Sequence, residues 1–126
     1  MKVSIITVTY NSADTLQDCI DSVANQSYKN IEHIVIDGNS KDDTLEIIQN
    51  NTSVSRYISE PDNGLYDAMN KGLKLASGDV IGILNSDDIY DNKDVISDVV
   101  NALGRYEALY TDLLYVDPHD TNLVRR

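Results

Sequence analysis

Two short runs of apolar, mostly β-branched residues constrain the fold of this chain more than any other feature. Residues 3–8 form a near-continuous run, and residues 31–36 place Ile and Val around two polar side chains. Such short apolar runs predict strands that are buried on both faces, as in a parallel sheet. Residues 56–59 and 80–84 predict two further strands, and residues 108–116 predict a last extended segment.

Apolar side chains recur at helical spacing between these runs. They predict helices around residues 16–24, 45–48, 65–76 and 95–103, with a loop from residue 50 to residue 55, and Cys19 falls on the apolar side of the first as a buried structural thiol. Ser12 or Asn11 is expected to cap the first helix and Ser40 the second, because short polar side chains accept hydrogen bonds from free helix N–H groups. Gly78 is expected to end the third helix in a left-handed conformation.

Alternating strands and helices predict the fold class. With short connections they form an open, mostly parallel α/β sheet with helices on both faces and right-handed crossovers. A length of 126 residues is sufficient for a single domain spanning residues 1–126. The N-terminus shows no signal-peptide pattern and no apolar run is long enough to span a membrane, so we expect a cytoplasmic protein.

Polar segments follow three of the predicted strands. They are residues 9–11, 37–40 and 85–88. In open α/β sheets ligands bind beyond the carboxyl ends of the strands, so these segments are expected to lie along one edge and to form a crevice.

Asp37 and Tyr10 have side chains that suit a nucleotide. A carboxylate at a strand end can accept hydrogen bonds from a ribose or a base, and a tyrosine ring can stack on a base. Each residue has an alternative interpretation. Asp37 can act as an acidic group at a helix N-terminus, and Tyr10 can simply pack on the sheet edge.

Asp87 and Asp88 end an apolar strand as two adjacent carboxylates. Like charges at that separation repel unless water or a cation lies between them. Mg²⁺ and Mn²⁺ bind one or two carboxylates together with phosphate oxygens, so the pair predicts a divalent cation held against a nucleotide. The alternative is that one of the two acids caps the following helix.

Composition and missing motifs exclude several functions. A net charge of −11 argues against nucleic acid as a partner, since such binding needs a basic surface. The single cysteine allows neither an intramolecular disulfide nor a cysteine-built zinc site. The chain contains no dinucleotide-binding glycine motif and no P-loop, and no Ser-His-Asp set is evident.

Several segments together resemble inverting family 2 glycosyltransferases with a GT-A, Rossmann-like fold, in particular members that build bacterial surface polysaccharides. Each segment alone is weak, but their order and spacing are specific, and the resemblance covers essentially the whole chain. The segments are residues 3–11, 36–40 with Asp43 and Thr44, 59–72, 84–88 and 110–112.

The resemblance implies a UDP- or GDP-sugar donor and Mn²⁺ or Mg²⁺. Asn85-Ser86-Asp87 stands where the family has its D-x-D motif, with Asn85 in place of the first acid, and the metal would be held by Asp87 and Asp88. The residues expected to bind the nucleotide-sugar are Thr9, Tyr10, Asn11, Asp37, Asn85, Ser86 and Asp87.

The family's catalytic base lies well beyond the D-x-D segment, so the resemblance places it after Arg126. Asp112 and Asp117 are downstream acids outside the family's base context. We therefore expect a truncated domain that carries the donor and metal site and is inactive on its own. The acceptor would be a saccharide or a lipid-linked sugar, which would bring the protein to the inner face of a membrane. The alternative is a non-catalytic nucleotide-sugar-binding or interaction module, and homo-oligomerisation stays open.

Overall fold

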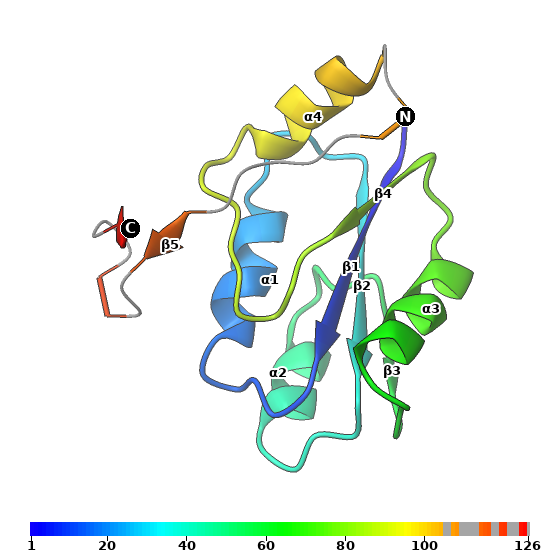
Figure 1. Ribbon diagram of the computed structural model, residues 1–126, viewed down its shortest axis with the longest axis vertical. Helices are drawn as coiled ribbons and strands as arrows, with labels where there is room; N and C mark the ends of the chain where they lie inside the picture. Colours follow the sequence, from blue (N-terminus) through cyan, green and yellow to red (C-terminus); the bar gives the residue numbers. More distant parts are fainter. Residues whose placement is uncertain (105–106, 109–113, 117–118, 121–123, 126) are drawn as a thin grey trace.

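A four-stranded parallel sheet forms the centre of the protein in a computed structural model that describes residues 1–104, 107–108, 114–116, 119–120 and 124–125 (Figure 1). The strand order is β3-β2-β1-β4. The predicted strands are confirmed with ends that differ by at most one residue. The strands are β1 Val3–Thr9, β2 Ile31–Asp37, β3 Arg56–Ser59 and β4 Val80–Ile83.

The register brings the carboxyl ends of the strands to one edge. Thr9 of β1 is level with Asp37 of β2, and Asp37 is level with Ser59 of β3. Strand β4 ends earlier, where Ile83 is level with Ile6. The segment after β4 therefore starts beside the last residues of β1.

Helices cover both faces of the sheet, as predicted. Helices α1 (Leu16–Ala24), α2 (Thr44–Asn50) and α4 (Val95–Leu103) pack on one face, and α3 (Leu65–Leu75) packs on the other (Figure 1). Every residue of β1 is buried, which is the burial expected for a central strand between two helical layers.

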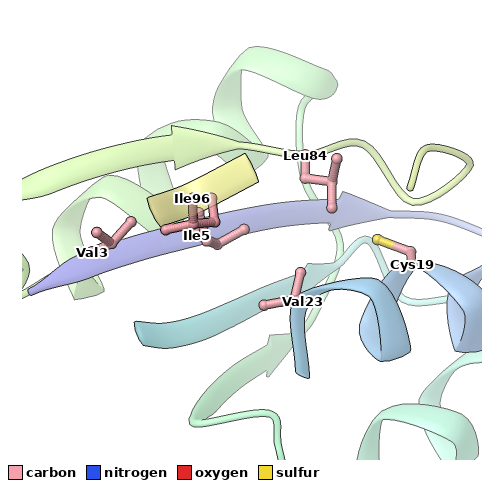
Figure 2. Packing of buried hydrophobic residues seen from close by; sticks show 6 residues of the cluster. All are labelled: Val3, Ile5, Cys19, Val23, Leu84 and Ile96. Carbon is pink, nitrogen blue, oxygen red and sulfur yellow. The ribbon is translucent and has the colours of Figure 1, made fainter. Parts of the chain in front are cut away.

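Side chains of β1 alternate between two apolar clusters because successive residues of a strand point to opposite faces. Ile6 and Val8 pack with Ala68 of α3. Figure 2 shows the opposite cluster, where β1, α1, α4 and the segment after β4 meet through Val3, Ile5, Cys19, Val23, Leu84 and Ile96. Cys19 is fully buried, which agrees with its predicted structural place.

Strand β4 is an edge of the described sheet, and two of its side chains are accessible. Ile81 and Ile83 are 43% and 45% exposed. Farther along the chain, β5 (Tyr115–Val116) pairs antiparallel with β6 (Val124–Arg125). The predicted extended segment 108–116 is described only at its ends, because residues 109–113 lie outside the described ranges.

The predicted helix caps are wrong in three places. Helix α1 is preceded by Thr15 and α2 by Asp43, without side-chain caps. The hydroxyls of Ser12 and Ser40 instead bond to groups outside their helices. Gly78 is not left-handed; a Cβ there would lie 2.6 Å from Ser4 Oγ, so glycine is needed for close packing.

Candidate donor and metal site

The loops that follow β1 and β2 are joined by backbone and side-chain hydrogen bonds. Gly38 N donates to Thr9 O over 3.0 Å, Asn11 N donates to Ser40 Oγ over 2.8 Å, and Lys41 N donates to Asn11 Oδ1 over 2.8 Å. Asn11 has a φ of 48°, a left-handed conformation that asparagine tolerates better than most residues. The two loops therefore form one continuous edge.

The loop after β4 joins the same edge. Ser86 Oγ lies 3.0 Å from Ser12 Oγ, and the thiol of Cys19 donates to Asn85 O over 3.5 Å. The three polar segments that the sequence placed on one edge are thus brought together by the fold.

Asp37 is completely buried at the end of β2. Its Oδ2 accepts hydrogen bonds from Ser40 N over 3.1 Å and from Ser59 Oγ over 2.7 Å, and its Oδ1 accepts one from Ser40 Oγ. The carboxylate thus fixes the loop after β2 and ties it to β3. Its predicted contact with a base or ribose stays a prediction.

Tyr10 lies over Gly38, and its ring is accessible. The side chain is 59% exposed, and a Cβ on Gly38 would lie 3.5 Å from Tyr10 Cδ2 and 2.8 Å from Asp62 Oδ2. The opposite carboxylate oxygen of Asp62 accepts a hydrogen bond from Gly64 N over 3.0 Å. An exposed ring beside a carboxylate is a surface on which a base could stack and donate a hydrogen bond.

Asp62 belongs to a fourth segment of the edge, which the sequence reasoning missed as part of the crevice. It follows β3, and the rule that ligands bind at the carboxyl ends of strands applies to β3 as well. Residues 60–64, after the short strand 56–59, have the composition of a turn, and the three polar segments expected at the edge do not include them.

The buried side-chain hydroxyl of Thr9 lacks a hydrogen-bond partner among the described residues. Its side chain is 6% exposed, and Oγ1 is one of two buried side-chain polar atoms without a hydrogen-bond partner among the described residues. A buried hydroxyl without a partner costs about 1–3 kcal/mol. A bound ligand at this edge is one way to satisfy it.

Asp87 and Asp88 form the acidic end of the loop after β4. Asp87 is exposed and Asp88 is half-buried, while Asp88 N donates to Asn85 O over 3.0 Å and closes a tight turn. Burial, and after it the charge of Asp87, raise the pKa of Asp88, and a hydrogen bond from Asn85 partly opposes that rise. A cation between the carboxylates would relieve this repulsion.

The donor set fits a cation that shares its ligands with a phosphate. Within the described ranges, no group of three or more His, Cys, Asp or Glu side chains is placed to hold a metal ion. Mg²⁺ and Mn²⁺ do not need such a cage, since they bind through one or two carboxylates together with substrate phosphates and water. Asp87 and Asp88 match that smaller set.

Asp112 and Asp117, the two acids that follow the D-x-D-like segment at a distance, lie outside the described residues. No helix in the described part of the chain is long and apolar enough to cross a membrane.

The family model and the relatives that match this chain all point to the same protein family. Residues 4–126 match the model of glycosyl transferase family 2. An uncharacterized glycosyltransferase of Mycobacterium tuberculosis is 45% identical over 103 residues, covering 80% of this chain and 39% of that protein. A PGL/p-HBAD biosynthesis glycosyltransferase of Mycobacterium bovis is 37% identical over 118 residues, covering 90% and 45%.

A third relative has a named donor and acceptor. The Escherichia coli UDP-Glc:alpha-D-GlcNAc-diphosphoundecaprenol beta-1,3-glucosyltransferase WfaP is 44% identical over 91 residues, covering 70% of this chain and 36% of that protein. The chain therefore spans less than half the length of these relatives.

Solved structures share the fold. S. aureus TarS 1-349 in complex with UDP-GlcNAc has a TM-score of 0.75 at 28% identity, covering 84% of this chain and 32% of that one. The mannosyltransferase PcManGT from Pyrobaculum calidifontis, in complex with GDP-Man and Mn²⁺, has a TM-score of 0.77 at 24% identity, covering 83% and 33%. The parallel sheet with helices on both faces is thus a GT-A arrangement, as the resemblance implied.

Proposed function

Because the chain belongs to glycosyl transferase family 2, we propose that it forms the part of a sugar transferase that binds a nucleotide-diphosphate-sugar donor. The observation that carries the proposal is the convergence of four strand-end segments on one edge, with the orphaned Thr9 hydroxyl, the exposed Tyr10 ring and the Asp87-Asp88 pair. The complex of TarS with UDP-GlcNAc and the UDP-Glc donor in the name of WfaP support this class of ligand.

Each group at the edge has a distinct role in the proposal. Tyr10 stacks on the base, and Thr9, Asn11 and Asp37 stand beside it for hydrogen bonds to base and ribose. Asn85 offers an amide to the ribose or sugar. Asp87 and Asp88 hold Mn²⁺ or Mg²⁺, which when bound would neutralise charge on the leaving diphosphate.

The whole protein would transfer the sugar with inversion, by in-line attack of an acceptor hydroxyl on the anomeric carbon after a base removes its proton. We propose a saccharide or lipid-linked acceptor in surface polysaccharide or glycolipid synthesis, since WfaP is named for a diphosphoundecaprenol-linked one. Work on such an acceptor would place the protein in the cytoplasm at the inner face of the membrane.

Calorimetry with UDP and with GDP, each with and without Mn²⁺, tests the donor site. We expect one nucleotide to bind more tightly than the other and Mn²⁺ to strengthen that binding. If neither nucleotide binds in the presence of Mn²⁺, the proposed function is wrong.

The variant Asp87→Ala tests the metal assignment. Losing one of two carboxylates should abolish the Mn²⁺ dependence of nucleotide binding while the circular dichroism spectrum stays unchanged, because the side chain is exposed. Asp91→Ala is the matched control, as it removes an exposed acid four residues farther along the same loop and should keep the parent's dependence. An Asp87→Ala protein that responds to Mn²⁺ like the parent would refute the assignment.

A non-catalytic interaction module is the second candidate. The exposed Ile81 and Ile83 on β4 favour it, because neighbouring apolar side chains at a sheet edge suit protein contacts. Sedimentation of this chain distinguishes the candidates: a dimer that Ile83→Asp dissociates, combined with no nucleotide binding, would support the module.

A further inference from the structure

Two serine hydroxyls connect the loop that carries Tyr10 to the loop that carries the acid pair. Ser86 is 9% exposed, and its Oγ lies 3.0 Å from Ser12 Oγ. Ser12 Oγ in turn donates to Tyr10 O over 3.2 Å. We call Ser86 and Ser12 the serine clasp.

The direction of these hydrogen bonds is fixed by the number of protons. A serine hydroxyl has one proton to donate and two lone pairs to accept with. Ser12 uses its proton on the carbonyl of Tyr10, so Ser86 must donate to Ser12. Chains of hydroxyls that point the same way polarise one another, so a change at one end is felt at the other.

The clasp is anchored on the side of Ser12. Ser12 N donates to Thr44 Oγ1 over 2.9 Å, and Thr44 Oγ1 donates to Asp42 Oδ1 over 2.5 Å. Thr44 is fully buried at the start of α2. Ser12 is therefore held by a rigid part of the fold.

A second contact fixes the start of the acidic loop. The thiol of Cys19 donates to Asn85 O over 3.5 Å. Burial raises the pKa of this thiol to about 11, with Thr7 lowering it and Asp88 and Asp87 raising it, so the thiol keeps its proton at neutral pH. The loop is thus held at Asn85 and at Ser86, immediately before the two acids.

We propose that the serine clasp makes cation binding at Asp87 and Asp88 and nucleotide binding at Tyr10 reinforce each other. Ser12 is then a positioning residue, which acts through Ser86 and the Tyr10 backbone rather than by touching the ligand. This inference rests on the proposed function, because it needs a nucleotide and a cation at this edge. Coupling between two sites is reciprocal, so either ligand strengthens the other.

The test measures the factor by which Mn²⁺ tightens nucleotide binding. UDP and GDP are each titrated with and without Mn²⁺, and Mn²⁺ is titrated alone, into the parent, Ser86→Ala, Ser12→Ala and the double variant. In Ser12→Ala we expect that factor to fall at least about fivefold. Metal-free nucleotide binding and Mn²⁺ binding alone should each stay within about twofold of the parent, because Ser12 belongs to neither set of ligands.

Two comparisons separate coupling from simple damage to the loop. Ser12→Thr keeps a hydroxyl and should restore the parent's factor, whereas the double variant should lose no more of that factor than Ser12→Ala. Ser53→Ala removes an exposed serine elsewhere and should behave as the parent.

The outcomes are distinguishable. If the parent binds neither UDP nor GDP, the proposed function fails and the inference falls with it. If the parent shows a Mn²⁺-strengthened affinity and Ser12→Ala keeps the same factor, the inference alone is overturned. It is also overturned if Ser12→Ala loses metal-free nucleotide binding and Mn²⁺ binding together, because that pattern indicates a disordered loop.

Discussion

Two buried side-chain atoms, Thr9 Oγ1 and His33 Nδ1, have no hydrogen-bond partner among the described residues, and the two differ in where they lie. Thr9 Oγ1 lies at the carboxyl end of β1, on the edge of the proposed donor site, where a bound molecule could supply its missing hydrogen bond. His33 Nδ1 lies within the fold, on a ring that is 2% exposed and whose Nε2 lies 2.8 Å from Thr7 Oγ1. The sequence could not separate the two, because burial depends on long-range packing.

Stability should fall as the pH drops because of His33. Burial lowers the pKa of its imidazole from 6.5 to about 4. Below pH 6.5 His33 binds a proton in the unfolded chain, but in the folded chain it stays neutral until about pH 4. Protonation therefore lowers the free energy of the unfolded state relative to the folded state. Over this window the contribution of His33 falls by on the order of 3 kcal/mol. Urea unfolding at several pH values measures it.

His33→Gln is the informative variant, because glutamine does not titrate and can still accept a hydrogen bond from Thr7. Its free energy of unfolding should depend less steeply on pH between 6.5 and 4. Equal slopes for parent and His33→Gln would contradict the assignment.

At the scale of elements, strands were easier to predict than helix ends. A strand between two helical layers is buried on both faces and is therefore mostly apolar. Every residue of β1 is buried, although Ser4, Thr7 and Thr9 are polar.

Helix ends depend on where one hydroxyl points. Ser12 and Ser40 have the sequence of caps, but their hydroxyls bond backward along the chain to Tyr10 O and to Asp37. Such short-range bonds compete with capping, and no local pattern encodes the further contact of Ser12 with Ser86.

Helix α3 should be sensitive to a single added methyl group. A Cβ on Gly72 would lie 2.5 Å from Ile6 Cγ2, and Ile6 is fully buried in β1. Alanine would gain about 1 kcal/mol of helix propensity, but forcing a methyl into a packed core costs about 1–3 kcal/mol. We expect overpacking to win, so Gly72→Ala should lower the free energy of unfolding by up to about 2 kcal/mol.

Gly104→Ala is the matched substitution at the end of α4. Its φ of −56° is helical, and among the described residues a Cβ there would meet only Asn101 O at 3.7 Å. Alanine should therefore be neutral or stabilise by up to about 1 kcal/mol, by restricting the unfolded chain. Chemical denaturation of both variants measures their free energies of unfolding. A Gly72→Ala protein as stable as Gly104→Ala would show that α3 can shift to make room for the methyl group.

At the scale of the whole molecule, the position of the site could be predicted from the sequence, but the contacts between its side chains could not. Alternating elements imply a parallel sheet, and a parallel sheet collects its strand ends at one edge, which placed Tyr10, Asp37 and Asp87 together. The strand order, the nearness of Asp62 to Gly38, and the complete burial of Asp37 arise from tertiary packing. Sequence pattern gives the edge; only packing decides which side chains face outward.

The net charge of −11 makes a prediction for the whole molecule. A nucleoside diphosphate approaching such a protein without a cation is repelled, and salt screens the repulsion by shortening the Debye length from about 30 Å at 0.01 M to about 8 Å at 0.15 M. Metal-free UDP binding should therefore tighten as NaCl rises over that range. With Mn²⁺ present the trend should reverse, because salt then screens the attraction between the cation and the acid pair.

Uridine is the control for this effect, since it carries no phosphate and its binding should not respond to NaCl. Calorimetry of UDP and uridine at both ionic strengths, with and without Mn²⁺, gives the four trends. Metal-free UDP binding that weakens with salt would mean that local positive groups outweigh the acidic surface. The anionic donor would then be held by the protein itself, and the cation would no longer be needed to explain how so acidic a chain binds it.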